Sequence, residues 1–148
     1  MAMNTSKVLV GGIVAGIVLN VIDWFVYTKL LVDRMTAAME GYKPGSAAVM
    51  MSSNAITVYV ITDFVIGLLL VWTYAAVRPR LGPGPMTAAT VAFLFWIYAA
   101  FINASSSLMT GMMGPRLFWM TELVGLITLI VGAVAGSALY KENDAPAA

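Results

Sequence analysis

Four long apolar stretches divide the chain, and each is long enough to cross a lipid bilayer. They run over about 8–31, 55–77, 86–108 and 117–140. Spanning the hydrocarbon core takes about 20 apolar residues in a helix, and inside lipid only helices and closed barrels satisfy every backbone hydrogen bond. The sequence therefore predicts an all-α membrane protein, a four-helix antiparallel transmembrane bundle with both termini on the same side.

The composition agrees with a single membrane domain over residues 1–148 and excludes several other classes of protein. The chain is 61% hydrophobic and only 10% charged, whereas soluble domains carry about 25% charged residues. The net charge of +1 gives no reason to expect binding to nucleic acid. Cys and His are both absent, which excludes thiolate metal sites and removes the most frequent general base. We therefore expect no enzyme and no cofactor.

Turn-forming residues separate the spans. The second connection, RPRLGPGP at residues 78–85, predicts a tight hairpin because Pro and Gly leave it little freedom. The first connection is longer, over about 33–54. Its first part either extends the first helix or lies along the membrane interface, and GYKPGS then breaks it.

The positive charges favour termini in the cytoplasm. Four basic residues flank the spans on each side, so the raw count is a tie. Arg78 and Arg80 lie in the shortest connection, and basic residues next to span ends are retained on the cytoplasmic side. We expect this connection and both termini to be cytoplasmic.

Glycines at helical spacing mark the predicted packing faces. Gly12 and Gly16 in the first span, and Gly132 and Gly136 in the fourth, form two G-x-x-x-G pairs. Such pairs let membrane helices approach closely. All four glycines fall in the cytoplasmic halves of their spans, so we expect tight packing there and wider helix separation in the outer half.

One polar layer crosses the outer half of the predicted bundle. Each span carries one carboxyl or carboxamide group at a similar depth, and these are Asp23, Asp63, Asn103 and Glu122. A charge at mid-membrane costs at least about 2.5–3.5 kcal/mol. The same helical faces add further polar candidates, namely Asn20, Tyr27 and Tyr59.

Three interpretations of this layer stay open. The groups can form a structural network with Arg, Lys, Tyr and Trp donors, in which Lys29, Arg34 or Arg116 reach inward from the outer boundary. They can bind a proton or a hard cation, because carboxyl and carboxamide oxygens suit such ions. They can also line a pocket for a polar ligand.

Methionines gather on the predicted outer side. The segment MTGMM contains Met109, Met112 and Met113. Thioethers bind Cu(I), but the lack of His and Cys makes that signal weak. Methionines also form adaptable contact surfaces, so we interpret this cluster as a candidate surface for another membrane subunit.

Three segments resemble a group of small, uncharacterised bacterial inner-membrane proteins with four spans. They are GGIVAGIVLN, YAAVRPRLGPGPMTA and AGSALYKE, of which the hairpin motif is the most specific. The resemblance implies a multi-pass protein of the bacterial inner membrane. It implies no catalytic residue.

The sequence favours an accessory or interaction subunit of a larger membrane assembly, surrounded by lipid. The alternative is a small ion- or proton-coupled transporter, or a protein that binds a polar ligand, using the carboxylate layer. A homo-oligomer fits either hypothesis, because the glycine stripes can also pack copies together.

Overall fold

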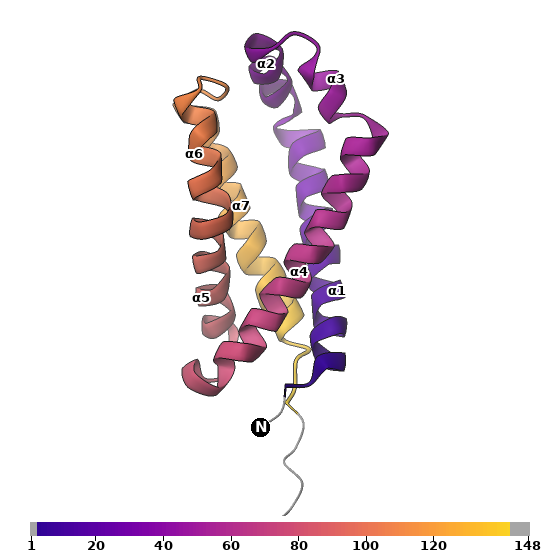
Figure 1. Ribbon diagram of the computed structural model, residues 1–148, viewed down its shortest axis with the longest axis vertical. Helices are drawn as coiled ribbons and strands as arrows, with labels where there is room; N and C mark the ends of the chain where they lie inside the picture. The colour runs from indigo at the N-terminus through magenta and orange to yellow at the C-terminus, as the bar shows by residue number, and fades with distance from the viewer. Residues whose placement is uncertain (1–2, 143–148) are drawn as a thin grey trace, which may run out of the picture.

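The chain folds into four long helical rods, as the sequence predicts (Figure 1). The computed structural model describes residues 3–142. Each rod is long and apolar enough to cross a membrane, so the molecule is an all-α, membrane-embedded bundle. No span end differs by more than four residues from its predicted position. The rods are α1 (Thr5–Phe25) with η1 (Val26–Leu30), α4 (Ser53–Leu81), α5 (Pro85–Phe95) with η2 (Trp96–Phe101) and α6 (Ile102–Met109), and α7 (Pro115–Ser137).

Both described ends of the chain lie at the same end of the bundle, which we call the base (Figure 1). The main-chain N–H of Asn4 donates to the hydroxyl of Tyr140 at 3.3 Å, which joins the two ends directly. The opposite end, which we call the distal end, carries α2 (Val32–Tyr42), α3 (Ser46–Met50) and the α6–α7 connection.

The first connection forms helices of its own. The backbone bends at Leu31, so α2 does not extend the first span. A positive φ of 85° at Gly45 separates α2 from α3. The Glu40 carboxylate then accepts hydrogen bonds from the main-chain N–H groups of Gly45 and Ala47, at 2.8 and 3.0 Å. These bonds satisfy donors that the start of α3 would otherwise leave unpaired.

The second connection is shorter than predicted, because α4 continues through Leu81 and includes Pro79. Proline removes one hydrogen bond to the preceding turn, and at this position the helix ends two residues later. Gly82 and Gly84 then make the turn with φ values of 83° and 128°, a region that favours glycine. The hairpin prediction is therefore confirmed, but its loop starts at Gly82 and not at Arg78.

Glycines bring α1 into main-chain contact with both of its neighbours. A methyl group added at Gly67 of α4 would lie 2.5 Å from the amide nitrogen of Gly16 and 2.6 Å from the carbonyl oxygen of Gly12. On the other side of α1, a methyl group added at Gly11 would lie 2.5 Å from the carbonyl oxygen of Gly136. The helices therefore meet backbone to backbone, which only glycine permits.

The main cluster of buried hydrophobic residues follows these contacts and lies in the base and the middle of the bundle. Toward the distal end, Phe118 and Leu31 are buried outside this cluster. Ala15, Leu70, Val71 and Ala133 are fully buried, and Leu19 is the most distal core residue of α1. Toward the distal end, the α1–α4 pair and the hairpin of α5, α6 and α7 diverge (Figure 1). The structure thus confirms the expected taper from a tightly packed base to a wider distal half.

A polar and aromatic network closes the base. The ring of Tyr140 packs edge-on against Tyr74 with centroids 6.1 Å apart, and the Arg78 guanidinium lies 5.5 Å from the centre of the same ring. Arg78 also pairs with Glu142 at 3.4 Å. The Tyr74 hydroxyl accepts a hydrogen bond from the main-chain N–H of Gly84 at 3.0 Å. This network connects α4, the hairpin turn and the end of the chain.

We predict that Gly67→Ala destabilises the bundle by about 1–3 kcal/mol, the usual cost of overpacking. The new methyl group would meet main-chain atoms of α1 that cannot move aside. Gly125→Ala is the matched control within a spanning helix, because nothing lies within 4 Å of a methyl group added there. Thermal unfolding in detergent, followed by circular dichroism, measures both variants. Equal unfolding temperatures for the two variants would contradict this account of the base.

Candidate functional site

Two spans change from α-helical to π-helical hydrogen bonding in their distal halves. In η1 the N–H of Leu31 donates to the carbonyl of Val26, and at the end of η2 the N–H of Ile102 donates to the carbonyl of Ile97. Each bond reaches back five residues, so each segment holds one extra residue in its turn and rotates the side chains that follow. Such turns are often found at functional sites.

The π-helical turns carry two aromatic residues of the polar layer. Tyr27 lies in η1, within electrostatic range of the carboxyl groups of Asp23, Asp63 and Glu122. Trp96 begins η2, and its indole N–H donates to the main-chain carbonyl of Glu122 at 3.1 Å. The same N–H lies beside the Glu122 carboxyl group. The structure therefore brings Asp23, Tyr27, Asp63 and Glu122 together from three spans, α1 with η1, α4 and α7. We call these four residues the carboxyl cluster.

Buried polar atoms without partners surround this cluster. Glu122 is only 6% exposed, and its Oε2 atom has no hydrogen-bond partner in the part of the chain that the structure describes. Thr128, one turn and a half further along α7, is 2% exposed. Its hydroxyl lies near the Asp23 carboxyl without a hydrogen bond of standard geometry. An unsatisfied buried polar group costs about 1–3 kcal/mol, and the Oε2 atom of Glu122 carries this cost in the described part of the chain.

No basic side chain neutralises the carboxyl cluster among residues 3–142. The one ion pair in this range is Arg78–Glu142 at the base. Lys29 lies over the ring of Trp24, 5.7 Å from its centre, and Arg34 donates to the sulfur of Met120 at 3.0 Å. Arg116 is exposed at the start of α7. The predicted pairing of the acids with Lys29, Arg34 or Arg116 is therefore not made.

Three other candidates from the sequence have different surroundings. Asn103 is exposed on α6, where its side-chain amide donates to the carbonyls of Ala99 and Tyr98 at 3.0 and 3.4 Å. The Asn103 amide therefore pairs with main-chain carbonyls at the place where the π-helical turn η2 gives way to the α-helix α6. Asn103 does not face the acids. Asn20 donates to Gly16 of its own helix at 2.9 Å and to Val60 of α4 at 3.3 Å, which ties α1 to α4 below the cluster. Tyr59 is exposed on α4.

The carboxyl groups do not converge on a metal-binding geometry. Within the described range, no group of three acids lies close enough together to hold one metal ion. Hard cations such as Ca²⁺ need six to eight oxygen ligands at short distance. The carboxyl cluster therefore does not form a multi-carboxylate metal site of this kind within the described residues.

Sequence reasoning missed Thr128 and underrated Trp96. Thr128 stands three residues after Gly125 and four before Gly132, which puts it on the helix face that meets α1. A lone threonine in an apolar span carries little signal by itself. Trp96 begins the π turn η2, and regular helical spacing does not predict where its side chain lies.

The distal methionines form a partly exposed surface. Met109 is 86% exposed at the end of α6, whereas Met112 and Met113 are half-buried in the α6–α7 connection. Val49 and Met51, at and just after the end of α3, are exposed as well. These side chains lie at or beyond the distal ends of the spanning helices, and Met109 is the last residue of the third span.

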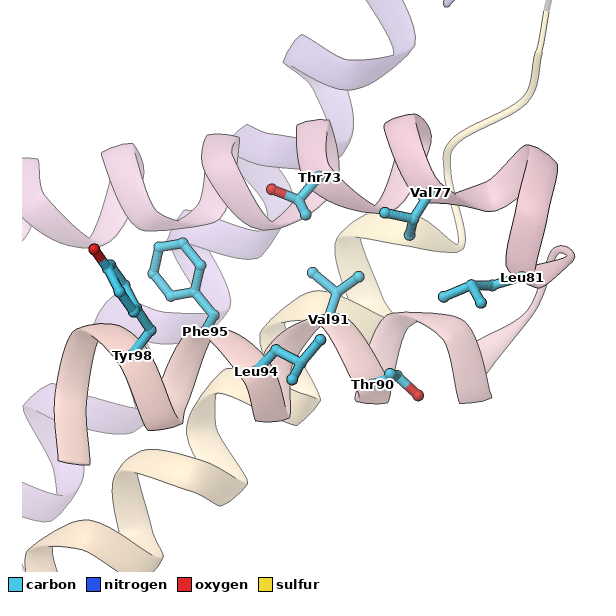
Figure 2. Close-up of a pocket in the computed structure, with 8 residues that line it drawn as sticks. All are labelled: Thr73, Val77, Leu81, Thr90, Val91, Leu94, Phe95 and Tyr98. Atoms are coloured by element: carbon cyan, nitrogen blue, oxygen red, sulfur yellow. The ribbon is translucent and has the colours of Figure 1, made fainter. Parts of the chain in front are cut away.

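A separate apolar groove runs between α4 and the third span in the basal half (Figure 2). Its volume is about 230 Å³. The Thr90 hydroxyl donates its hydrogen to the carbonyl of Met86 at 2.9 Å. A groove of this kind in a bilayer fits acyl chains and not a polar substrate. Its walls consist of Thr73, Val77, Leu81, Thr90, Val91, Leu94, Phe95 and Tyr98.

Comparison of the chain with protein-family models, with curated protein sequences and with solved structures finds no match. The resemblance of the hairpin motif to small bacterial membrane proteins therefore stays a prediction. The functional argument depends on the carboxyl cluster itself.

We predict that Glu122→Met raises the unfolding temperature in detergent. The variant removes a buried oxygen that has no partner, which is worth about 1–3 kcal/mol. It keeps the main-chain carbonyl to which Trp96 donates. Glu122→Gln is the control, because it removes the charge but leaves polar atoms at the same place. A lower unfolding temperature for Glu122→Met would contradict our interpretation and would favour a structural network.

Proposed function

We propose that this protein binds a cation within the membrane, as a small ion- or proton-coupled transporter or as a membrane-embedded binding protein. The site consists of Asp23, Asp63 and Glu122, with Tyr27 and Thr128 beside them. The observation that carries the proposal is Glu122, a buried acid with an unpartnered oxygen. It lies within electrostatic range of Tyr27, as Asp23 and Asp63 do, and no basic side chain among residues 3–142 forms an ion pair with any of the three acids. Ionisable groups inside membranes usually mark ion or substrate pathways.

The wide distal half supports this function. The continuous hydrophobic core ends near the middle of the bundle, so the acids are not surrounded by it on every side. The closely packed base would block passage at the other end. We propose a bacterial inner membrane with both termini in the cytoplasm, so that the cluster opens toward the outer side.

We predict that dicyclohexylcarbodiimide labels Asp23, Asp63 or Glu122 in the purified protein at neutral pH. This apolar reagent attacks carboxyl groups that carry a proton in a membrane-like environment, and it leaves ionised groups in water largely unmodified. Peptide mass spectrometry identifies the labelled residues. Bound cations should protect the cluster, since they replace the proton.

The control residue is Asp33, an exposed acid in the first turn of α2. Asn103→Ala should keep the labelling pattern, because Asn103 does not face the acids. Labelling of Asp33 alone, or of no residue, would refute a cation site at the carboxyl cluster.

The second candidate is an accessory or interaction subunit of a larger membrane assembly. The exposed distal surface of Val49, Met51 and Met109 favours it, because these apolar side chains are exposed where the spanning helices end. Methionine suits such contacts through its flexibility. The partner can be another membrane subunit or a second copy of the chain.

We predict that Met51→Gln with Met109→Gln reduces association of the protein with its native assembly without lowering its unfolding temperature. Both side chains are exposed, so polar replacements should cost little stability. Native gel migration after mild solubilisation measures the association. Met86→Gln is a matched control, since Met86 is exposed at the base. A wild-type protein that always migrates as a single chain would exclude the accessory role.

A further inference from the structure

The apolar groove between α4 and the third span has about the length of one bilayer leaflet. Its walls run from Leu81 to Thr73 on α4, and from Thr90 to Tyr98 on the facing span (Figure 2). The step from Thr73 to Leu81 covers eight residues, or about 12 Å of helix rise. Half of the hydrocarbon core measures about 15 Å. Because Leu81 ends its span, the groove extends from the membrane boundary at the base toward the bilayer centre.

The shape of the groove suits a slender apolar chain. Its volume is about 230 Å³, and Val77 points into it from α4 toward Val91 on the facing helix (Figure 2). Leu81, Leu94 and Tyr98 on its rim are exposed, so the groove is open to the surrounding lipid. A helix of a second copy has a diameter of about 10–12 Å with its side chains, so a second copy could insert only single side chains. One extended acyl chain fits along the whole groove.

A basic residue stands at the basal end of the groove. Arg80 directly precedes Leu81 and shares a helical face with Thr73 and Val77, which lie seven and three residues earlier. Arg80 is exposed and makes no ion pair among residues 3–142, whereas Arg78 pairs with Glu142. Basic groups at the membrane boundary between spans attract anionic lipid headgroups.

The relative position of charge and groove matches the layout of a phospholipid. A phospholipid carries its phosphate just outside the hydrocarbon layer and its acyl chains directly inside it. Arg80 lies in the last turn of α4, and the groove continues from this turn into the apolar part of the bundle. One lipid molecule can therefore contact both features at once.

We infer that the groove binds one acyl chain of an anionic phospholipid, whose phosphate lies at Arg80. The bound chain adds apolar contacts between α4 and α5 along the groove walls. None of the groove residues belongs to the carboxyl cluster, so this site is separate from the proposed cation site and does not depend on it.

Native mass spectrometry of the purified protein, titrated with phosphatidylglycerol in detergent, tests the inference. We predict that one phosphatidylglycerol molecule is retained saturably. Phosphatidylcholine with the same chains should bind about fivefold more weakly, because its headgroup has no net negative charge. Lysophosphatidylglycerol should bind as well as phosphatidylglycerol, since only one chain enters the groove. Glycerol 3-phosphate, which has the phosphate without a chain, should not be retained.

Variants separate the contributions of the charge and the groove. Arg80→Gln should weaken phosphatidylglycerol binding about fivefold and remove the preference over phosphatidylcholine. Lys7→Gln is the matched control, because Lys7 is exposed on α1 at the same end of the bundle. It should bind as the wild type does.

Larger side chains should fill the groove and exclude the lipid. Val77→Phe and Thr73→Phe, which add rings at two positions on its α4 wall, should each weaken binding at least tenfold. Val65→Phe is the control, since Val65 is exposed on the same helix outside the groove. Circular dichroism identifies the folded variants, and either filling variant is sufficient for the test.

Four results would overturn the inference. They are no saturable retention of phosphatidylglycerol, equal binding of phosphatidylglycerol and phosphatidylcholine by the wild type, unchanged binding in a folded filling variant, and retention of glycerol 3-phosphate as tight as that of the lipid. A dimer without bound lipid that the filling variants dissociate would assign the groove to a second copy, and it would overturn the inference as well. Because the carboxyl residues are intact in every variant, these results leave the test of the cation site by dicyclohexylcarbodiimide unaffected.

Discussion

The main-chain contact of α1 with α4 and α7 determines the rest of the structure. Gly67 meets Gly12 and Gly16 on one side of α1, and Gly136 meets Gly11 on the other. Because no side chains stand between them, these helices lie closer together at the glycines than larger residues allow elsewhere along the bundle. Straight rods that touch at one end and carry larger side chains at the other must diverge. The wide distal half, in which the acids lie, is therefore a consequence of the packing at the base.

Aromatic rings hold the distal half together where the continuous core is absent. Phe101 contacts Phe118 and Trp119 across the third and fourth spans, with centroids 6.0 and 5.8 Å apart. Such ring contacts join helices at a greater separation than glycine contacts do. The π turn that begins at Trp96 directs this residue toward Glu122 while Phe101 still reaches α7. The same segment thus stabilises the helical hairpin and forms one wall of the candidate site.

The spans and the direction of the helices could be predicted from the sequence, because they follow from span length. Helical spacing pointed to Gly12, Gly16, Gly132 and Gly136, but the contacts of Gly11 and Gly67 were not predicted. The candidate site was predictable only in part. Asp23, Asp63 and Glu122 share a layer as expected, but Asn103 does not face them. A π turn adds a residue and rotates every later side chain, so helical spacing cannot assign the face of Asn103. The sequence also could not show that the acids lack basic partners among the described residues. The basic side chains make other contacts, such as that of Arg34 with Met120, which only the tertiary structure specifies.

Among residues 3–142 the carboxyl cluster forms no ion pair with a basic side chain, and this is itself an argument for binding. Lys29 and Arg34 lie on the distal side with long, flexible side chains, and an ion pair with Glu122 would relieve a buried charge. Such a pair would also act as a tethered competitor, because a side chain of the same molecule is present at a high effective concentration. An external cation could then bind only after displacing it. A structural network gains from internal pairing, whereas a binding site must leave its charge free. The engagement of Lys29 by Trp24 and of Arg34 by Met120 keeps both side chains away from the cluster, which favours a binding site.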